Sequence, residues 1–247
     1  MPKRSALITG ASSGIGKATA IAFADAGFDL LLIARSQTKL SALANELQAK
    51  GVKAEGVAID LSEVAQVKHR VERAIAAFHS TDVATGETSL DTVVNCAGMG
   101  YTGPLHTMPL ADWQQVMAMN VTSVLQVVQA VLPDMRAKGK GMIVNIASIA
   151  AQHSFPDWGA YGVSKSALVA LSGAIAAEES DNGIRVVTVS PGAVNTPIWD
   201  SETVQADFDR TLMLMPETIA QTILYTVLMP PGAVISELTI TPSQGAL

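Results

Sequence analysis

The sequence predicts an α/β domain with a doubly wound fold, in which helices flank a mainly parallel, seven-stranded sheet. Three observations favour this fold class. Short apolar runs alternate with longer segments, as strands and covering helices do in such sheets. The first run leads through a glycine-rich turn, Gly10–Gly16, into a helical segment. The chain has 247 residues, 49% hydrophobic and only 15% charged, which suits one domain, 1–247, with a large core.

The strands are predicted from short apolar runs, and the helices from the longer segments between them. We expect strands at Ser5–Thr9, Asp29–Ala34, Lys53–Ile59, Asp91–Asn95, Met142–Ile146, Arg185–Ser190 and Val234–Ile240. We expect helices at Ile15–Ala26, Thr38–Lys50, Glu63–Phe78, Ala111–Lys138, Tyr161–Glu179 and Pro216–Leu228. The segment His79–Leu90 is polar and long for a connection, so we expect a surface loop there.

Composition excludes several function classes. The single cysteine, Cys96, rules out an internal disulfide and is typical of a reducing compartment. Met1–Arg4 leads directly into the first strand and leaves no room for a signal peptide, so we expect a cytoplasmic protein. The net charge of −6 argues against a nucleic-acid partner. No metal site is predicted, because the histidines lack ligand spacing: His69, His79, His106 and His153.

One stretch, Trp113–Pro133, contains no charged residue and has about the length of a membrane-spanning helix. It carries four glutamines and Asn120, however, and lies between predicted strands of the sheet, so we do not expect it to cross a membrane. A helix this poor in charge must be covered on more than one side. Val163–Ala177 is similarly apolar. The two helices predict a helix-bundle interface with a second subunit; the alternative is a well-covered internal helix.

The glycine-rich turn has the context of a phosphate-binding loop, because it joins a strand to a helix. Its spacing is Gly-x-x-x-Gly-x-Gly, with glycines at 10, 14 and 16. Glycines allow the backbone to turn tightly and to approach a pyrophosphate, whose charge is stabilised by the amides at a helix N-terminus. The alternative is an ordinary strand-to-helix turn. We favour a phosphate-binding role.

Tyr161 and Lys165 are four residues apart, which places them on one face of the predicted helix. An adjacent ammonium favours the phenolate and would lower the pKa of the tyrosine. Such a pair can give a proton to a developing alkoxide or take one from an alcohol. Taken alone the spacing is weak support, since most such pairs lie on exposed helix faces.

Together these motifs resemble those of the short-chain dehydrogenases/reductases. The resemblance rests on residues in the order and spacing of that family: Thr9-Gly10-Ala11-Ser12-Ser13-Gly14-Ile15-Gly16, Asn95-Cys96-Ala97-Gly98, Asn120, Ser148, Tyr161-x-x-x-Lys165 and Pro191-Gly192. It implies an NAD(P)-dependent oxidoreductase on a Rossmann-type domain, assembled as a dimer or tetramer.

The resemblance also implies four catalytic roles. Ser148 would donate a hydrogen bond to a substrate carbonyl, and Tyr161 would protonate its oxygen. Lys165 would hold the nicotinamide ribose and lower the pKa of Tyr161. Asn120 would hold a water in a proton relay towards Lys165. The alternatives are that Ser148 caps a turn and that Asn120 bonds a neighbouring carbonyl.

The end of the second strand predicts NADP(H) as the cofactor. An acidic residue here would bind the adenosine ribose of NAD, but the chain has Ala34 where the NAD-dependent members resemble one another in having Asp. No carboxylate would repel a 2′-phosphate, and Arg35 can bind one bidentately. Ser12 or Ser13 could add a hydroxyl donor. The alternative for Arg35 is a solvated cation at the start of a loop.

Further cofactor contacts are expected where the strands end. Asp60 and Leu61 resemble an adenine-contacting pair, although Asp60 could instead be a helix N-cap. Cys96 stands where the family usually has a second Asn, and we interpret it as a small buried residue and not a reactive thiol. The full predicted set is Gly10, Ser12, Ser13, Gly14, Ile15, Gly16, Arg35, Asp60, Leu61, Asn95, Ala97, Gly98, Tyr161, Lys165, Pro191, Gly192, Val194 and Thr196. Within it, Val194 and Thr196 would hold the nicotinamide carboxamide, the alternative being a mere Pro-Gly turn.

Three segments, 100–109, 150–158 and 198–215, should line an apolar substrate pocket, and residues 196–215 are expected to form a mobile loop. The predicted function is NADPH-dependent reduction of a ketone or aldehyde, or the reverse oxidation of an alcohol. One alternative is a 3-oxoacyl-thioester reductase, although the C-terminus lacks the expected paired glycines. Another is a non-enzymatic NADPH-binding sensor or scaffold, which would not need Ser148, Tyr161 and Lys165.

Overall fold

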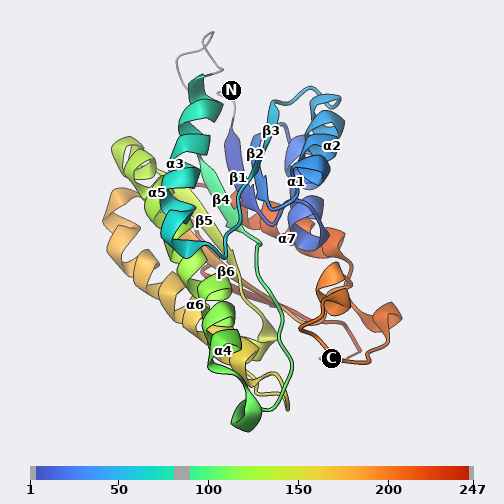
Figure 1. Cartoon of the computed structure of the whole chain (residues 1–247). Coiled ribbons are helices and arrows are strands. Elements are labelled where there is room, and N and C mark those ends of the chain that lie inside the picture. Colours follow the sequence, from blue (N-terminus) through green and yellow to red (C-terminus); the bar gives the residue numbers. More distant parts are fainter. Residues whose placement is uncertain (1–3, 81–89, 245–247) are drawn as a thin grey trace.

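The computed structural model describes residues 4–80 and 90–244. Seven parallel strands form one sheet in the order β3-β2-β1-β4-β5-β6-β7 (Figure 1), which confirms the predicted doubly wound, Rossmann-like arrangement. The strands are β1 (Ser5–Thr9), β2 (Asp29–Ala34), β3 (Ala54–Ala58), β4 (Thr92–Asn95), β5 (Gly141–Ile146), β6 (Ile184–Pro191) and β7 (Glu237–Ile240).

Helices cover both faces of the sheet (Figure 1). On one face lie α1 (Gly14–Asp25), α2 (Gln37–Gln48) and α7 (Pro216–Val227); on the other lie α3 (Val64–Ser80), α4 (Leu110–Met117), α5 (Ser123–Lys138) and α6 (Gly159–Glu179). Successive strand residues point to opposite faces. Leu30 and Leu32 therefore pack under α1 and α2, whereas Leu31 and Ile33 pack under α3. This explains why β1 and β2 are buried along their whole length and apolar in their central residues.

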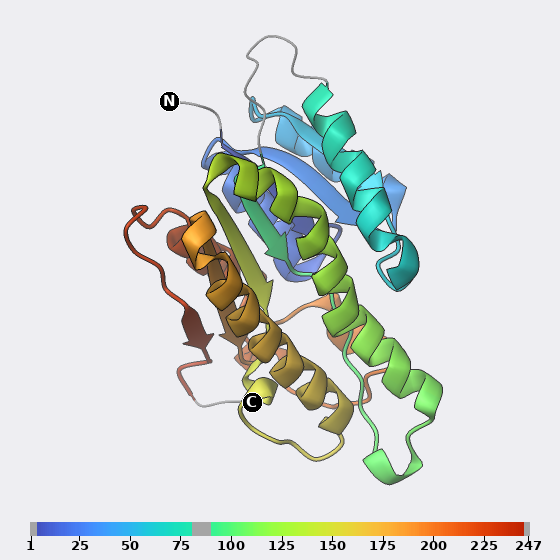
Figure 2. The same ribbon diagram turned by 90° about the vertical axis from the view of Figure 1, so that its left-hand side faces the viewer.

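The predicted helix Ala111–Lys138 is interrupted by a π-helical turn. Helix α4 leads into a π-helix at Ala118–Thr122, and α5 continues from it to Lys138. Figure 2 shows this long helix and α6 side by side on the outer face. Extra residues in a π turn shift the backbone locally and are frequent at functional sites. Here the turn contains Asn120, whose side chain is fully buried.

Most of the other boundaries differ from the prediction by one or two residues, and two of the differences have a visible cause. Strand β7 begins at Glu237 and not at Val234, because the preceding residues form a turn held by Arg185, which donates to the carbonyls of Met229, Pro230 and Ala233. The predicted loop His79–Leu90 is wrong for its first two residues, which extend α3 as Phe78 buries its ring beneath them. Residues 81–89 of that loop lie outside the described residues.

Two helical stretches, Leu110–Lys138 and Gly159–Asn182, are long and apolar enough to cross a membrane by length and composition. Both lie on the sheet, where their inner faces contribute Val124, Val127, Leu168 and Ile175 to the core. This is the packing that the sequence predicts for these helices. Less than half of each apolar stretch is buried.

Candidate active site

The predicted site residues gather at the carboxyl edge of the sheet. Gly10 follows β1, Arg35 follows β2, Asp60 follows β3, and Ser148 follows β5. The glycine turn and residues 95–98 flank the point between β1 and β4 where the strand order reverses. Ligands of open parallel sheets bind in the crevice at such a point. The fold therefore brings together residues from distant parts of the chain.

The three glycine positions of the turn have no space for a side chain. A Cβ on Gly10, which has φ +66°, would lie 2.9 Å from the backbone of Ala97. A Cβ on Gly16 would lie 2.3 Å from the carbonyl oxygen of Gly10. Gly14 has φ +51°, a conformation that side chains rarely adopt. The three glycines allow α1 to begin directly against the end of β1.

The N-terminus of α1 suits an anion. The N-cap residue, Ser13, makes no side-chain capping hydrogen bond, and the first turn contains no acidic residue. The first amides of the helix therefore keep their capacity to bind a phosphate. Ser12 and Ser13 are half-buried beside them, and Ile15 packs onto the core and anchors the turn.

The segment after β4 has little side-chain bulk where it borders the site. The amide of Ala97 donates to Thr9 Oγ1 at 3.1 Å, and Gly98 is exposed. A Cβ on Gly98 would lie 3.2 Å from Asn120 Oδ1 and 3.5 Å from Lys165 Nζ. Asn95 instead points into the sheet, where its Nδ2 donates to Asn145 Oδ1 at 2.8 Å.

Cys96 is half-buried and packs against the core on the side of the sheet that α1 covers. Burial raises the pKa of its thiol to about 12, and hydrogen bonding to Thr19 only partly opposes this. The thiol is therefore protonated at neutral pH, which agrees with the interpretation of Cys96 as a small packing residue.

An exposed cation, Arg35, follows β2, and a carboxylate that already accepts hydrogen bonds, Asp60, follows β3. Arg35 is exposed, whereas Ala34 is buried. The Asp60 carboxylate accepts from the amide and the hydroxyl of Ser62, at 2.9 and 2.7 Å. Asp60 thus stabilises the turn that precedes α3 and not the first turn of the helix itself. Leu61 is 4% exposed and its side chain packs in the core, and the contact of this residue with a cofactor stays a prediction.

Ser148 and Tyr161 lie together above β5. Ser148 Oγ accepts from the amide of Ala150 at 3.1 Å and so caps a short 3-10 turn. The same hydroxyl hydrogen-bonds to the phenol of Tyr161 and lowers its pKa. Burial acts more strongly and raises the pKa of Tyr161 above its ordinary value of 10.0. The phenol is accordingly protonated at neutral pH.

Lys165 does not act on this phenol as the sequence predicts. Its Nζ donates to the carbonyl oxygen of Ile146 at 2.8 Å and lies 5.7 Å from the centroid of the Tyr161 ring. The predicted lowering of the tyrosine pKa by Lys165 is therefore wrong for this structure, in which burial dominates. Lys165 is 5% exposed, and burial lowers its own pKa to about 8.

The side chain of Asn120 ties three elements together. Its Oδ1 accepts from the amide of Met99 at 2.8 Å, and its Nδ2 donates to Met99 O and to Ser164 Oγ, both at 2.9 Å. Ser164 in turn donates to the carbonyl of Tyr161 at 2.7 Å. Asn120 thus bonds a neighbouring carbonyl, as the alternative reading proposed. Sequence reasoning missed Ser164, and the one signal that could have found it is its place between Tyr161 and Lys165.

The segment after β6 closes the site. Gly192, which follows Pro191, donates its amide to Ile240 O at 2.7 Å, and Val194 forms a parallel bridge with Leu214. The side chain of Thr196 lies against Gly14 of the glycine turn, since a Cβ there would be 3.0 Å from Thr196 Cγ2. Val194 and Thr196 therefore lie beside the predicted phosphate loop.

A row of aromatic rings leads away from Tyr161. The ring of Trp158 is 5.3 Å from that of Tyr161, Trp199 is 5.6 Å from Trp158, and Phe208 is 5.4 Å from Trp199, each in edge-to-face contact. Such contacts are favourable beyond the area they bury. Trp158 and Trp199 lie in segments that are expected to line the substrate pocket, and that lining stays a prediction; Met213 is buried, and Tyr101 donates to Asp112 Oδ2 at 3.0 Å.

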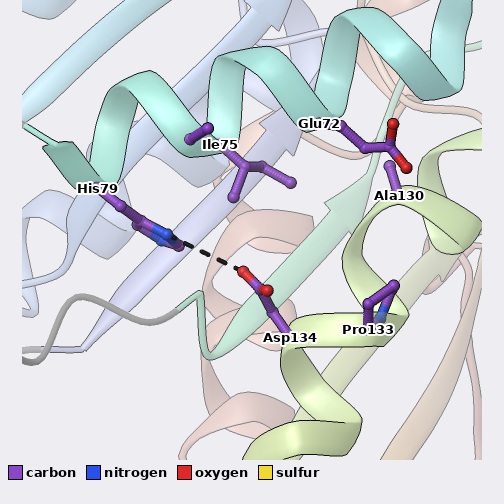
Figure 3. Close-up of a pocket in the computed structure, with 7 residues that line it drawn as sticks. Glu72, Ile75, His79, Ala130, Pro133 and Asp134 are labelled. Carbon is purple, nitrogen blue, oxygen red and sulfur yellow. Dashed lines mark ion pairs between the residues drawn. The ribbon is translucent and has the colours of Figure 1, made fainter.

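A separate pocket of about 300 Å³ lies between α3 and α5 (Figure 3). It is lined by Glu72, Ile75, Ala76, His79, Ala130, Pro133 and Asp134. His79 Nδ1 faces Asp134 Oδ2 across it at 3.9 Å. None of the predicted site residues lines this pocket.

Comparison with known proteins identifies the family. The sequence pattern described as short chain dehydrogenase matches residues 4–207. The chain is 32% identical over 239 residues to an uncharacterised oxidoreductase of Staphylococcus haemolyticus, covering 97% of both proteins. It is 31% identical over 248 residues to sulfoacetaldehyde reductase 2 of Chromohalobacter salexigens, covering 97% of this chain and 94% of the relative.

Solved structures give the same result. An alcohol dehydrogenase from Thermococcus sibiricus, complexed with 5-hydroxy-NADP, superposes with a TM-score of 0.86 at 28% identity and 99% coverage of both chains. A metagenomic short-chain oxidoreductase in complex with NADP superposes with a TM-score of 0.81 at 31% identity, with 97% of each chain covered.

Proposed function

The chain belongs to the short chain dehydrogenase family, and on that premise we propose that it is an NADPH-dependent carbonyl reductase. It reduces neutral ketones or aldehydes and, in reverse, oxidises the corresponding alcohols. The observation that carries this proposal is the contact between Ser148 and Tyr161, next to Lys165, at the carboxyl edge of the sheet. Similar proteins are named oxidoreductases, so a purely nucleotide-sensing role loses its support.

The nucleotide would be held by the glycine turn and the N-terminus of α1 on one side, and by Lys165 and Thr196 on the other. Gly98 fits this placement, because its missing side chain leaves the space beside Lys165 Nζ open. Bound NADPH supplies a hydride to the substrate carbon. Arg35, exposed at the end of β2 where no acid stands, would bind the 2′-phosphate. The NADP in the similar solved structures supports this choice.

Tyr161 provides the proton. Because burial raises the pKa of its phenol, the group is protonated at neutral pH and can donate to the substrate oxygen as negative charge develops there. Ser148 stabilises the same oxygen with its hydroxyl. The Lys165 ammonium, held against Ile146, adds positive charge below the site. We also propose a water relay through Asn120. The hydrogen bonds of the Asn120 side chain with Met99 and Ser164 would hold the π turn in the conformation that such a relay needs.

The substrate is proposed to be neutral and apolar. Trp158 and Trp199 are the large side chains that extend from Tyr161. Arg210 is the single arginine or lysine in segments 98–109, 147–158 and 192–215, and its guanidinium already bonds Asn195, Asp200 and Thr196. An anionic substrate, such as the sulfoacetaldehyde named for one relative, would find no free cation in these segments.

We also propose a cytoplasmic homodimer or homotetramer. The outer faces of α5 and α6 support the assembly, because their apolar stretches are less than half buried in one chain. Sedimentation of the purified protein tests it, and a monomer would refute it.

The test of the activity is NADPH oxidation with matched substrates. The panel contains a neutral branched aldehyde (3,3-dimethylbutanal), sulfoacetaldehyde, a cyclic ketone and a 3-oxoacyl thioester, each with NADPH and with NADH. We expect turnover of the neutral compounds, with NADPH preferred by at least about tenfold, and loss of turnover in Tyr161→Phe while NADPH still binds. Higher kcat/KM with sulfoacetaldehyde or the thioester would refute the proposed substrate class, and wild-type activity in Tyr161→Phe would refute the mechanism.

The nucleotide preference has its own variant. In Arg35→Ala we expect the KM for NADPH to rise by at least about tenfold, with the KM for NADH little changed, because only NADPH carries the 2′-phosphate. Lys39→Ala, which removes an exposed cation from the first turn of α2, is the matched control. Equal effects on both nucleotides would show that Arg35 does not bind the 2′-phosphate.

A further inference from the structure

The substrate loop, residues 196–215, is seated on the segment that follows β4. We propose that Gly100 and Val204 form this seat, and that both are positioning residues which hold the loop, and with it Trp199, against Tyr161. The inference rests on the proposed function and adds to it the residues that set the shape of the substrate pocket.

The seat is a close contact that leaves no space for a side chain at position 100. Gly100 is buried, and a Cβ on it would lie 2.6 Å from Val204 Cγ2 and 3.4 Å from Ile198 Cγ1. Val204 is itself 6% exposed, although most of its neighbours in the loop are exposed. Interiors are packed densely enough that one added methyl group is felt. Val204 thus fills the place of the missing side chain of Gly100.

Hydrogen bonds fix the same contact. The amide of Thr102 donates to Thr203 O at 2.9 Å, and Thr203 Oγ1 donates to Gly100 O at 2.7 Å. The amide of Gln205 donates to Thr102 Oγ1 at 2.7 Å. Three bonds between two such short segments define one position of the loop along the segment 100–102.

The seat is connected to the chemistry through adjacent residues. Ile198 lies over Gly100, and the next residue, Trp199, packs against Trp158, whose ring contacts Tyr161. The indole of Trp199 also donates to Val194 O at 2.8 Å. A loop lifted from Gly100 would therefore move Trp199 away from the substrate side of Tyr161.

Arg210 secures the far end of the loop. Its guanidinium donates to Asn195 Oδ1 at 2.9 Å, to Asp200 Oδ1 at 2.6 Å and to Thr196 O at 2.9 Å. These bonds tie the end of the loop to its beginning, so a change at Gly100 shifts Ile198, Val204 and the residues between them without releasing the loop from the protein. This makes the seat testable by substitution.

The test is Gly100→Ala with its compensating partner Val204→Ala. The backbone of Gly100 is not in the left-handed region, so alanine adds only a methyl group that meets Val204. We expect Gly100→Ala to lower kcat/KM for the best ketone by at least about tenfold, because small displacements at an active site cost much rate. The double variant should recover most of this loss. Gly232→Ala, with nothing within 4 Å of the added methyl group and a place in the turn before β7, is the control and should keep wild-type kinetics.

The position of the loop has a readout besides activity. Trp158 and Trp199 contribute a coupled near-ultraviolet circular dichroism signal that should fall in Gly100→Ala and return in the double variant. The proposal that Gly100 and Val204 position the loop would be overturned if Gly100→Ala has wild-type kinetics. It would also be overturned if adding Val204→Ala does not restore the lost kcat/KM. If Gly100→Ala does not fold, Thr203→Val removes the bond to Gly100 O instead and should lower kcat/KM by about three- to tenfold; no change would overturn the proposal. If the wild-type protein is inactive, the proposed function is refuted. The circular dichroism signal of the two tryptophans then still tests whether the contact between Gly100 and Val204 positions the loop.

Discussion

The ammonium nitrogen of Lys165 lies 2.8 Å from the main-chain oxygen of Ile146, so the lysine of α6 is held against the carboxyl end of β5. The contact gives Lys165 one defined position under the site. It does not replace the water that the charge loses on burial, which is why the pKa of Lys165 falls to about 8. The position of this charge is therefore maintained at the expense of stability.

Replacing Lys165 by Met should stabilise the protein and inactivate it. The substitution removes a buried charge and keeps a side chain of similar length, so we expect the free energy of unfolding at pH 7 to rise by about 1–3 kcal/mol. The kcat should fall at least about 100-fold. Urea denaturation and steady-state kinetics measure the two effects. A destabilised Lys165→Met protein would mean that the bond to Ile146 outweighs the cost of burial.

The same lysine predicts how stability changes with pH. Its pKa is about 8 in the folded protein and 10.5 in a free side chain, so between these values the unfolded chain binds more protons. Its contribution to the free energy of unfolding therefore rises with pH from about 8 towards 10.5, and its penalty is complete below pH 8. The stability advantage of Lys165→Met should shrink from pH 7.5 to 9.5. A constant difference across that range would contradict the assignment.

Glu179, at the end of α6, should contribute stability at neutral pH. Its side chain is 1% exposed, and Oε2 accepts from Arg136 Nε at 2.8 Å and from Asn182 Nδ2 at 2.9 Å. The hydrogen bond from Arg136 holds the pKa of Glu179 below its ordinary value of 4.5. This stabilisation is present above pH 4.5 and is lost as the pH falls through the folded pKa.

We expect Glu179→Gln to lower the free energy of unfolding by about 1–3 kcal/mol at pH 7. The deficit should diminish on acidification below pH 4.5, as Glu179 itself becomes protonated. The neighbouring Glu178 is exposed, so Glu178→Gln is the control and should change stability by less than about 0.5 kcal/mol. Thermal denaturation at pH 7 and pH 4 makes the comparison, and equal effects of the two variants would refute the prediction.

Two glycine-to-alanine variants should have opposite effects. In Gly16→Ala the new methyl group would lie 2.3 Å from Gly10 O, so α1 must move away from β1. We expect a loss of stability of about 1–3 kcal/mol and NADPH binding weakened at least about tenfold. In Gly173→Ala the methyl group enters open space within α6 and should stabilise the protein by about 0.5–1 kcal/mol. Calorimetry and fluorescence titration with NADPH measure both, and unaltered NADPH binding by Gly16→Ala would contradict the first.

The framework of the fold was predictable because each part of it has a local cause. Apolar runs that are buried on both faces can hardly be anything but central strands of a parallel sheet, and β1 and β2 have the bounds that the sequence predicts. The glycines at 10, 14 and 16 were recognisable from the sequence, because a residue without a side chain stands at each position where the fold has no space for one.

The pKa shifts in the site were not predictable from the sequence, because they depend on how deeply each group is buried. Proximity in sequence suggested that Lys165 lowers the pKa of Tyr161, whereas the structure directs the ammonium to Ile146 and buries the phenol. The π turn around Asn120 also escaped prediction, since the apolar pattern of the long helix continues through it. Its cause is a set of contacts with Met99 and Ser164, which are distant in the chain.

The substrate loop was predicted in extent but not in detail. Acidic and apolar residues alternate there without a period, so the sequence gives no sign that Val204 is buried or that Arg210 bonds three acceptors. The contacts that bury Val204 join residues about a hundred positions apart, as the bond of Thr203 to Gly100 does.

The strand order has a consequence for synthesis of the chain. Strand β1 is made first and lies in the middle of the sheet, with β2 on one side and β4 on the other. As the chain leaves the ribosome, β2 and β3 follow early, but β4 does not begin until Thr92. During that interval the nascent polypeptide carries an apolar strand with one unsatisfied edge, the kind of surface that invites aggregation. We therefore expect a fragment that ends before Thr92 to expose this edge of β1 and to aggregate.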